Sequence, residues 1–230
     1  MSDALELYRA DQTRAIDRHA IDVLGIPAYT LMKRAGEAAW TELRRRWPRA
    51  RRIGVACGAG NNGGDGYVLA RLARAEGCVL HVVASAPPRG PEAVRAAADW
   101  EASGGTTLGP DASPPDGVDV WVDALLGTGL DRPPQGPVAA LVDAINASGR
   151  PVLAMDVPSG VDADRGSTPG VAVRASVTVS FITAKPGLLT GAGRTLSGER
   201  VLASLGVPAA AFEGQTASAR SFRQSALERW

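Results

Sequence analysis

Histidine and cysteine are scarce in this chain, and their scarcity excludes several kinds of site. Only two histidines occur among 230 residues, His19 and His81, so neither a histidine-rich zinc site nor a Ser–His–Asp triad is expected. The two cysteines, Cys57 and Cys78, lie in apolar segments without a CxxC spacing, and we interpret them as reduced thiols of the protein core. The Gly-Lys-Ser/Thr ending of a P-loop is also missing, which argues against a P-loop NTPase.

The chain has no excess of either charge, because its formal net charge is +1. We therefore expect no nucleic-acid partner, and we interpret the arginine-rich run at residues 44–52 as the solvated end of a helix. No apolar stretch approaches the length that spans a membrane, and residues 1–10 lack the basic start and apolar run of a signal peptide. These features predict a cytoplasmic protein without a membrane partner.

The pattern along the chain predicts two helices and then strands that alternate with helices. The first fifty residues hold the two helices, which end near Gly25 and Pro48. The expected strands are 52–57, 78–83, 119–122, 151–155 and 177–182, and the helices between several of them are 65–76, 91–103 and 137–148. Strands that are apolar on both faces predict an α/β fold, a Rossmann-like three-layer sandwich with helices on both faces of a mostly parallel sheet. The length favours one domain.

Ligands of such a sheet bind beyond the carboxyl ends of the strands, where three unusual segments fall. They are residues 58–66, 123–134 and 156–164. The first is a glycine-rich loop that opens a helix, and glycines together with free helix amides suit an anion such as phosphate. Gly58, Gly60 and Gly63 match the dinucleotide fingerprint G-x-G-x-x-G, but the acidic residue expected about twenty positions later is missing.

The other two segments place carboxylates at the ends of strands. Asp123 ends one strand and Asp156 ends the next, where Pro158 stiffens the turn and would aim Asp156 and Ser159 rigidly. Two carboxylates beside a glycine loop suit acid–base catalysis or a cation site. Lys185 lies at a further strand end, either as a solvated lysine or as a functional cation.

These motifs closely resemble those of the NAD(P)H-hydrate epimerase family. The resemblance runs in order through roughly residues 5–215 and rests on the segments 31–36, 57–66, 123–129, 156–162, 185–187 and 205–208. Its most specific part is Asn-Asn-Gly-Gly-Asp-Gly at 61–66, and one departure is Lys33, where the family usually has an acid.

The resemblance implies an isomerase that interconverts the R and S forms of hydrated NADH and NADPH, called NADHX and NADPHX, in nicotinamide nucleotide repair. It implies an epimerase domain over residues 1–216, a tail or linker at 217–230, and a homodimer. The implied functional partner is an NAD(P)HX dehydratase, which some relatives carry as a fused second domain. The chain would then be a stand-alone epimerase or the amino-terminal half of a bifunctional enzyme.

The resemblance also assigns roles to individual residues. The substrate would be held by Asn61, Asn62, Gly63, Gly64 and Asp65, by Gly127, Thr128, Gly129, Leu130, Asp131, Arg132 and Pro133, and by Asp156. A potassium ion would be bound through oxygens of Asn62, Asp123 and Ser159. Oxygen ligands suit such a hard cation.

The chemistry of the hydrate favours a carboxyl group as the catalytic group of the site. The hydrated ring carries a hydroxyl on a carbon bonded to the ring nitrogen. Once an acid protonates that hydroxyl, the nitrogen lone pair expels it and leaves a planar iminium, to which water returns on either face. One carboxyl group could serve both directions, so we expect Asp156 to be the general acid and base, with Lys185 steadying the charge nearby.

Two other functions stay open at this point. A non-catalytic nucleotide-sensing or protein-binding module could use the same fold, because a fold does not fix a function. A nicotinamide-dependent dehydrogenase is disfavoured by the missing ribose acid and by the lack of a catalytic His or Tyr in the strand-end loops, although Ser85 and Arg89 could seat a 2′-phosphate instead.

Overall fold

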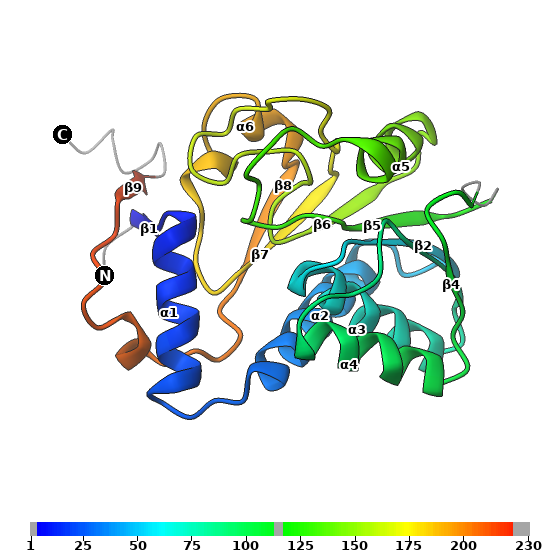
Figure 1. The fold of residues 1–230 in the computed structure, drawn as a ribbon. Helices are drawn as coiled ribbons and strands as arrows, with labels where there is room; N and C mark the ends of the chain where they lie inside the picture. The colour runs from blue at the N-terminus through cyan, green and yellow to red at the C-terminus, as the bar shows by residue number, and fades with distance from the viewer. Residues whose placement is uncertain (1–3, 113–116, 223–230) are drawn as a thin grey trace.

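The computed structural model describes residues 4–112 and 117–222, and its centre is a sheet of seven parallel strands (Figure 1). The strand order across the sheet is β4-β3-β2-β5-β6-β7-β8. Their bounds are β2 (Arg52–Cys57), β3 (Val79–Ala84), β4 (Thr107–Leu108), β5 (Val120–Ala124), β6 (Val152–Met155), β7 (Val177–Phe181) and β8 (Glu199–Ala203). The chain runs outward from β2 to β4 and then returns to β5, so the order reverses between β2 and β5. Ligand crevices form at such a switch point, beyond the carboxyl ends of the strands.

Helices cover both faces of the sheet, as the sequence predicts, and the α/β fold class is confirmed. On one face lie α2 (Ala28–Arg46), α3 (Asn61–Ala75) and α4 (Pro91–Ala102), and on the other lies α5 (Gly136–Ala147) (Figure 1). Three short helices follow late in the chain: η1 (Pro186–Leu188), α6 (Gly193–Leu196) and η2 (Ala209–Phe212).

Successive residues of a strand enter different cores, because side chains alternate between the faces of a sheet. On β5, Val120 and Val122 belong to the core beneath α2 and α3. Trp121, between them, packs with Leu141 and Ile145 of α5 in the second core. Each such buried side chain contributes about 1.5–3 kcal/mol relative to an exposed one, so both faces hold the sheet in place.

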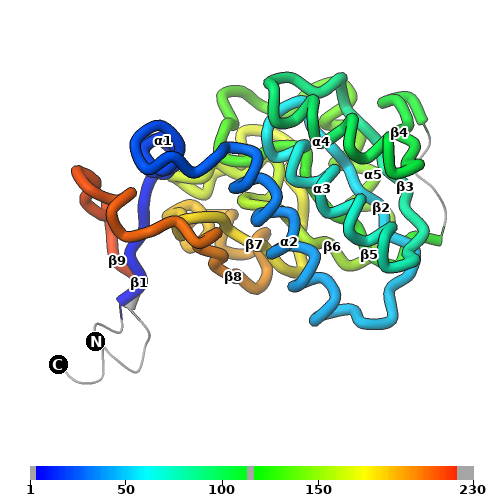
Figure 2. The backbone as a smooth tube through the Cα atoms, turned by 90° about the horizontal axis from the view of Figure 1, so that it is seen from below, coloured from blue at the N-terminus to red at the C-terminus, as the bar shows by residue number. Residues whose placement is uncertain are grey.

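The remaining helix, α1 (Ala10–Asp22), stands with a two-stranded ribbon beside the β7–β8 end of the sheet (Figure 2). The ribbon pairs β1 (Ala4–Leu7) antiparallel with β9 (Ala219–Phe222). The strand β9 lies inside the segment 217–230 that we expected to be a tail or linker, and residues 223–230 lie outside the described part of the chain. The domain boundary at residue 216 stays a prediction.

The main difference from the predicted elements is the start of α3. The sequence predicts a helix from residue 65, whereas α3 begins at Asn61, so its first turn includes Asn62 and Gly63. The strands β1, β4, β8 and β9 were not expected either. Cys57 and Cys78 are buried and unpaired, and burial raises the pKa of the Cys57 thiol. In the part of the chain that the structure describes, no helix combines the length and apolar character needed to cross a membrane.

Candidate functional site

A cavity of ≈ 680 Å³ opens beyond the carboxyl ends of β2, β5, β6 and β7. Nine residues that the sequence predicts for the site line it: Asn61, Asn62, Asp65, Gly127, Thr128, Gly129, Arg132, Asp156 and Lys185. Five other predicted substrate-binding residues are outside its lining: Gly63, Gly64, Leu130, Asp131 and Pro133. The three loops predicted to converge do contribute to one cavity, as expected for strand ends of one parallel sheet.

One wall of the cavity comes from α1 and was missed by reasoning from the sequence. Thr13, Arg14, Asp17 and Ile21 line it, at spacings that place them on one side of that helix. The helical spacing of α1 could be recognised in the sequence, but no residue pattern states where the helix packs. Its position is fixed in part by a hydrogen bond of 2.6 Å between the buried hydroxyls of Thr13 and Thr183.

At two positions the glycine loop packs directly against neighbouring backbone atoms. A Cβ atom at Gly58 would lie 1.7 Å from the carbonyl oxygen of Leu125, and one at Gly63 would lie 1.9 Å from the carbonyl oxygen of Gly58. At Gly60 a Cβ would meet nothing within 4 Å. The glycines at 58 and 63 therefore join the start of α3 to the end of β5, while Gly60 borders the open cavity.

Asp156 and Lys185 form an ion pair in the cavity wall. Lys185 Nζ donates to Asp156 Oδ1 at 2.5 Å, to the Phe181 carbonyl at 2.7 Å and to Ser180 Oγ at 3.2 Å. The lysine side chain is fully buried and that of Asp156 is 14% exposed. The Phe181 amide also donates to Asp156 Oδ1, at 3.2 Å. No group in the described ranges donates to Asp156 Oδ2, so this oxygen is free to contact a ligand.

The backbone around the cavity holds three uncommon conformations. Asp156, Ile182 and Leu205 have φ angles of 64°, 63° and 54°, the left-handed region that side chains other than glycine rarely adopt. All three residues line the cavity. Conformations of this kind cost of order 1–3 kcal/mol each and cluster at functional sites. The strain is largest at Ile182 and Leu205, because aspartate adopts this region more readily, and it lies in the backbone around the cavity that Asp156 lines.

Two of the predicted potassium ligands lie together behind the cavity wall. Asp123 is fully buried and accepts hydrogen bonds from Ser159 Oγ at 2.6 Å, the Ser159 amide at 2.8 Å and the Leu125 amide at 3.2 Å. The pKa of Asp123 is raised to about 6, because the effect of burial outweighs that of these three donors, which lower it. The third predicted ligand, Asn62, has a buried Nδ2 atom without a hydrogen-bond partner in the described structure.

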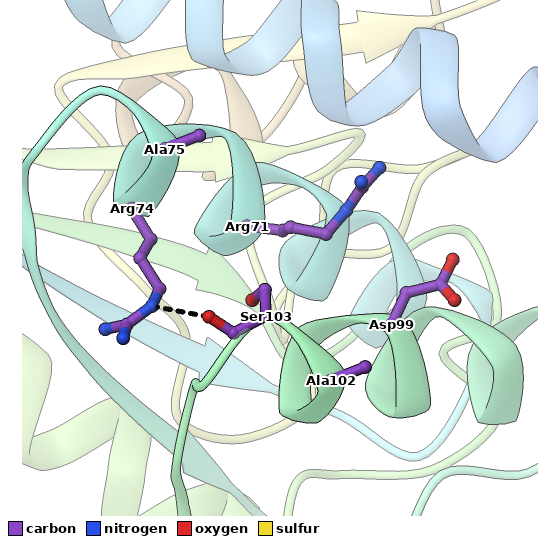
Figure 3. A pocket seen from close by; sticks show the side chains of 6 residues that line it. All are labelled: Arg71, Arg74, Ala75, Asp99, Ala102 and Ser103. Atoms are coloured by element: carbon purple, nitrogen blue, oxygen red, sulfur yellow. Dashed lines mark hydrogen bonds between the residues drawn. The ribbon is translucent and has the colours of Figure 1, made fainter.

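A second hollow, of ≈ 640 Å³, lies between the carboxyl-terminal ends of α3 and α4 (Figure 3). Two arginines of α3, Arg71 and Arg74, line it together with Asp99 and Ser103, and Arg74 Nε donates to the Ser103 carbonyl at 3.0 Å. None of the residues predicted for the site belongs to its lining. The strand-end cavity is therefore the candidate site.

Comparison with known proteins identifies a matching family and several similar proteins. Residues 28–187 match the family described as YjeF-related protein N-terminus. The chain is 43% identical over 226 residues to the bifunctional NAD(P)H-hydrate repair enzyme of Escherichia coli strain K12, with 97% of this chain and 44% of the relative covered. It is 38% identical over 201 residues to the NAD(P)H-hydrate epimerase of Limosilactobacillus fermentum, with 84% of this chain and 94% of the relative covered.

The chain thus spans less than half the length of the bifunctional relatives and nearly all of the shorter one. Among solved structures, the yeast protein ynu0 is similar with a TM-score of 0.71 and 24% identity, over 80% of this chain and 83% of that one. At that identity the likeness supports the fold alone. Because the family match covers more than half of the sequence, the chain belongs to the family of YjeF-related protein N-terminal domains.

Proposed function

We propose that the chain is an NAD(P)H-hydrate epimerase that interconverts the R and S forms of NADHX and NADPHX. The observation that carries the proposal is the Asp156–Lys185 ion pair in the wall of a cavity that the start of α3 also lines. The Limosilactobacillus relative, of which the chain covers 94%, is named for this activity. A non-catalytic module has less support, because such a module has no need of an ion-paired carboxylate in the wall of a cavity.

The residues of the cavity divide the work of binding and chemistry. The amides of the first turn of α3, beside Asn61 and Asn62, and the guanidinium of Arg132 favour the negative charge of the substrate pyrophosphate. Lys185 donates to Asp156 Oδ1, which leaves Asp156 Oδ2 to accept the proton of a water that adds to the iminium. Binding roles for Gly63, Gly64, Leu130, Asp131 and Pro133, and for the other loop residues, remain part of the proposal.

The test of this function is direct exchange between the two epimers. Purified protein is added to NADHX or NADPHX enriched in one epimer, and both epimers are separated and followed over time. We expect the second epimer to form many times faster than it does without protein. Exchange at the spontaneous rate, for both nucleotides and in potassium buffer, would refute the proposal.

We also propose that a potassium ion is held by Asn62, Asp123 and Ser159. These ligands fit a cation, because the carboxylate of Asp123 is fully buried and has no cationic partner among the described residues, and such an anion is costly. The buried Nδ2 atom of Asn62, which has no hydrogen-bond partner in the described structure, fits too, since a half-turn about the last torsion exchanges nitrogen for oxygen. When bound, the ion would compensate the charge of Asp123 and hold the glycine loop against the 156–160 turn.

Potassium is expected to raise the melting temperature of the wild type more than lithium does at equal ionic strength. Binding to the native state alone adds about 2.7 kcal/mol at a concentration of one hundred times Kd, which is roughly 5–11 °C for a chain of this size. The Asp123→Ala variant, which removes the buried carboxylate, should show no difference between the two ions and should bind nucleotide more weakly. Equal melting temperatures of the wild type in the two salts would contradict the ion site.

The wider setting of the enzyme is likewise proposed. The names of the longer relatives describe a bifunctional repair enzyme, which supports an NAD(P)HX dehydratase as the functional partner, whether fused or separate. A homodimer and a cytoplasmic location complete the proposal. Sedimentation of the purified chain would test the dimer.

A further inference from the structure

Asp65 is a buried acid whose charge no group compensates in the part of the chain that the structure describes. It lies in the second turn of α3, is 9% exposed and lines the strand-end cavity. Within the described residues, its carboxyl group makes no hydrogen bond and no ion pair, whereas the buried Asp123 has three donors. A buried carboxylate without a partner is costly, so Asp65 needs either a proton or a ligand.

Asp65 lines the cavity at a turn of α3 where the neighbouring elements pack closely. A Cβ atom at the preceding Gly64 would lie 2.8 Å from Met32 Sδ and 3.1 Å from Ala93 Cα. One at the following Gly66 would lie 2.6 Å from the Cβ of Ala124. The two glycines therefore let α2, α4 and β5 close tightly around α3 at this turn.

The carboxyl groups of Asp65 and Asp156 have different surroundings in the cavity. Burial, followed by the charges of Asp156 and Asp17, raises the pKa of Asp65 well above its usual range. Asp156 has the opposite environment, because Lys185 donates to it. The other charged residues that line the cavity are Arg14, Arg89, Glu92 and Arg132. A carboxyl group whose protonated form burial favours and another that accepts from a lysine can act as an acid and a base.

Resting on the epimerase function proposed above, we propose that Asp65 is a second catalytic residue, which transfers protons on the ring face that Asp156 does not reach. An epimerase must make and break the same carbon–oxygen bond on both faces of a planar intermediate. Two carboxyl groups from different elements, α3 and the end of β6, can each serve one face.

The proton and electron balance of the reaction follows from these two positions. Asp65 donates its proton to the hydroxyl of one epimer, which leaves as water with the electrons of its carbon–oxygen bond, while the nitrogen lone pair forms the iminium double bond. A water on the side of Asp156 then bonds to the same carbon, the double-bond electrons return to nitrogen, and Asp156 takes the proton that this water loses. In the reverse direction the two residues exchange roles, and between forward turnovers water carries the proton back from Asp156 to Asp65.

The test follows both epimerisation and entry of ¹⁸O from labelled water into each epimer, starting from one epimer at a time. The wild type should epimerise and label both forms. Asp65→Asn should epimerise at least about 100-fold more slowly but still label one epimer, the one whose hydroxyl faces Asp156. Asp156→Asn should label only the other epimer. Asp143→Asn, at an exposed position of α5 outside the cavity lining, is the control and should match the wild type.

Three outcomes would overturn the assignment, and they can be told apart. Asp65→Asn that epimerises within about threefold of the wild type shows that one carboxyl group is enough. Asp65→Asn that loses labelling of both epimers equally, while melting at the wild-type temperature, shows a role in binding alone. A wild type that neither epimerises nor labels refutes the epimerase function itself, and this assignment with it.

Discussion

Asp156→Asn is expected to slow epimerisation by roughly two to four orders of magnitude, the usual contribution of a positioned proton-transfer group. Asparagine keeps the size of the side chain, and its oxygen can still accept from Lys185 Nζ and the Phe181 amide, which now bond to Asp156 Oδ1. It cannot take up a proton, and it leaves the charge of the buried lysine without its counter-ion. Steady-state rates with separated epimers measure the effect.

The fold should survive this substitution. The φ angle of 64° at residue 156 lies in the left-handed region, which asparagine adopts more readily than most residues. We therefore expect the loss in kcat, with KM and the affinity for intact NADH or NADPH changed only a few-fold. A variant that turns over within about threefold of the wild type would remove Asp156 from the mechanism.

The sheet could be predicted from the sequence because its inner strands are buried on both faces. Runs such as residues 52–57 and 151–155 are apolar without alternation, which is typical of strands in a covered parallel sheet. The order of strands and helices then requires that the loops after β2, β5 and β6 meet at one edge. This geometric rule predicts that Asn62 and Asp156 lie at one cavity, and both residues line it.

The elements that the sequence did not predict depend on contacts between distant parts of the chain or lack a clear local pattern. The edge strand β8 begins with the exposed Glu199 and Arg200 and lacks an apolar run, and β1 pairs with β9 from the far end of the chain. The start of α3 was missed because glycines have low helix propensity. At Gly63 and Gly64 that propensity is overridden by close packing, which a pattern of single residues cannot reveal.

The burial of Lys185 could not be predicted for a similar reason. A lysine after a strand is solvated by default, and only the tertiary fold places this one at 0% exposure. Its charge is accepted there because three oxygens, from Asp156, Phe181 and Ser180, lie within hydrogen-bond distance. The short-range sequence around 185 contains the Ser180 and Phe181 partners but gives no indication that the chain folds back over them.

Gly63→Ala, which adds one methyl group to the first turn of α3, is expected to lower the stability of the fold strongly. The new Cβ would lie 1.9 Å from the Gly58 carbonyl oxygen and 2.9 Å from the Gly58 nitrogen, both backbone atoms that no side-chain rotation can move. Gly58 has little room to move, because it packs against the backbone of Leu125, where a Cβ built on Gly58 would lie 1.7 Å from the carbonyl oxygen. Relief therefore requires a shift of α3 away from β5, at a cost of about 3 kcal/mol or more.

Gly60→Ala is the matched control for this prediction, since it adds the same methyl group to the same loop. A Cβ at Gly60 meets nothing within 4 Å, and its φ of −91° suits any residue, so stability should stay within about 0.5 kcal/mol of the wild type. Thermal unfolding of the pair measures the difference, which should be roughly 6–12 °C in melting temperature for a chain of this size. If both variants melt together, the contact between Gly63 and Gly58 does not hold the start of α3 in place. A large loss of stability in Gly63→Ala alone instead identifies close backbone packing as the reason that a glycine-rich segment forms the first turn of a helix. The same packing then holds Asn62 and Asp65 at the cavity.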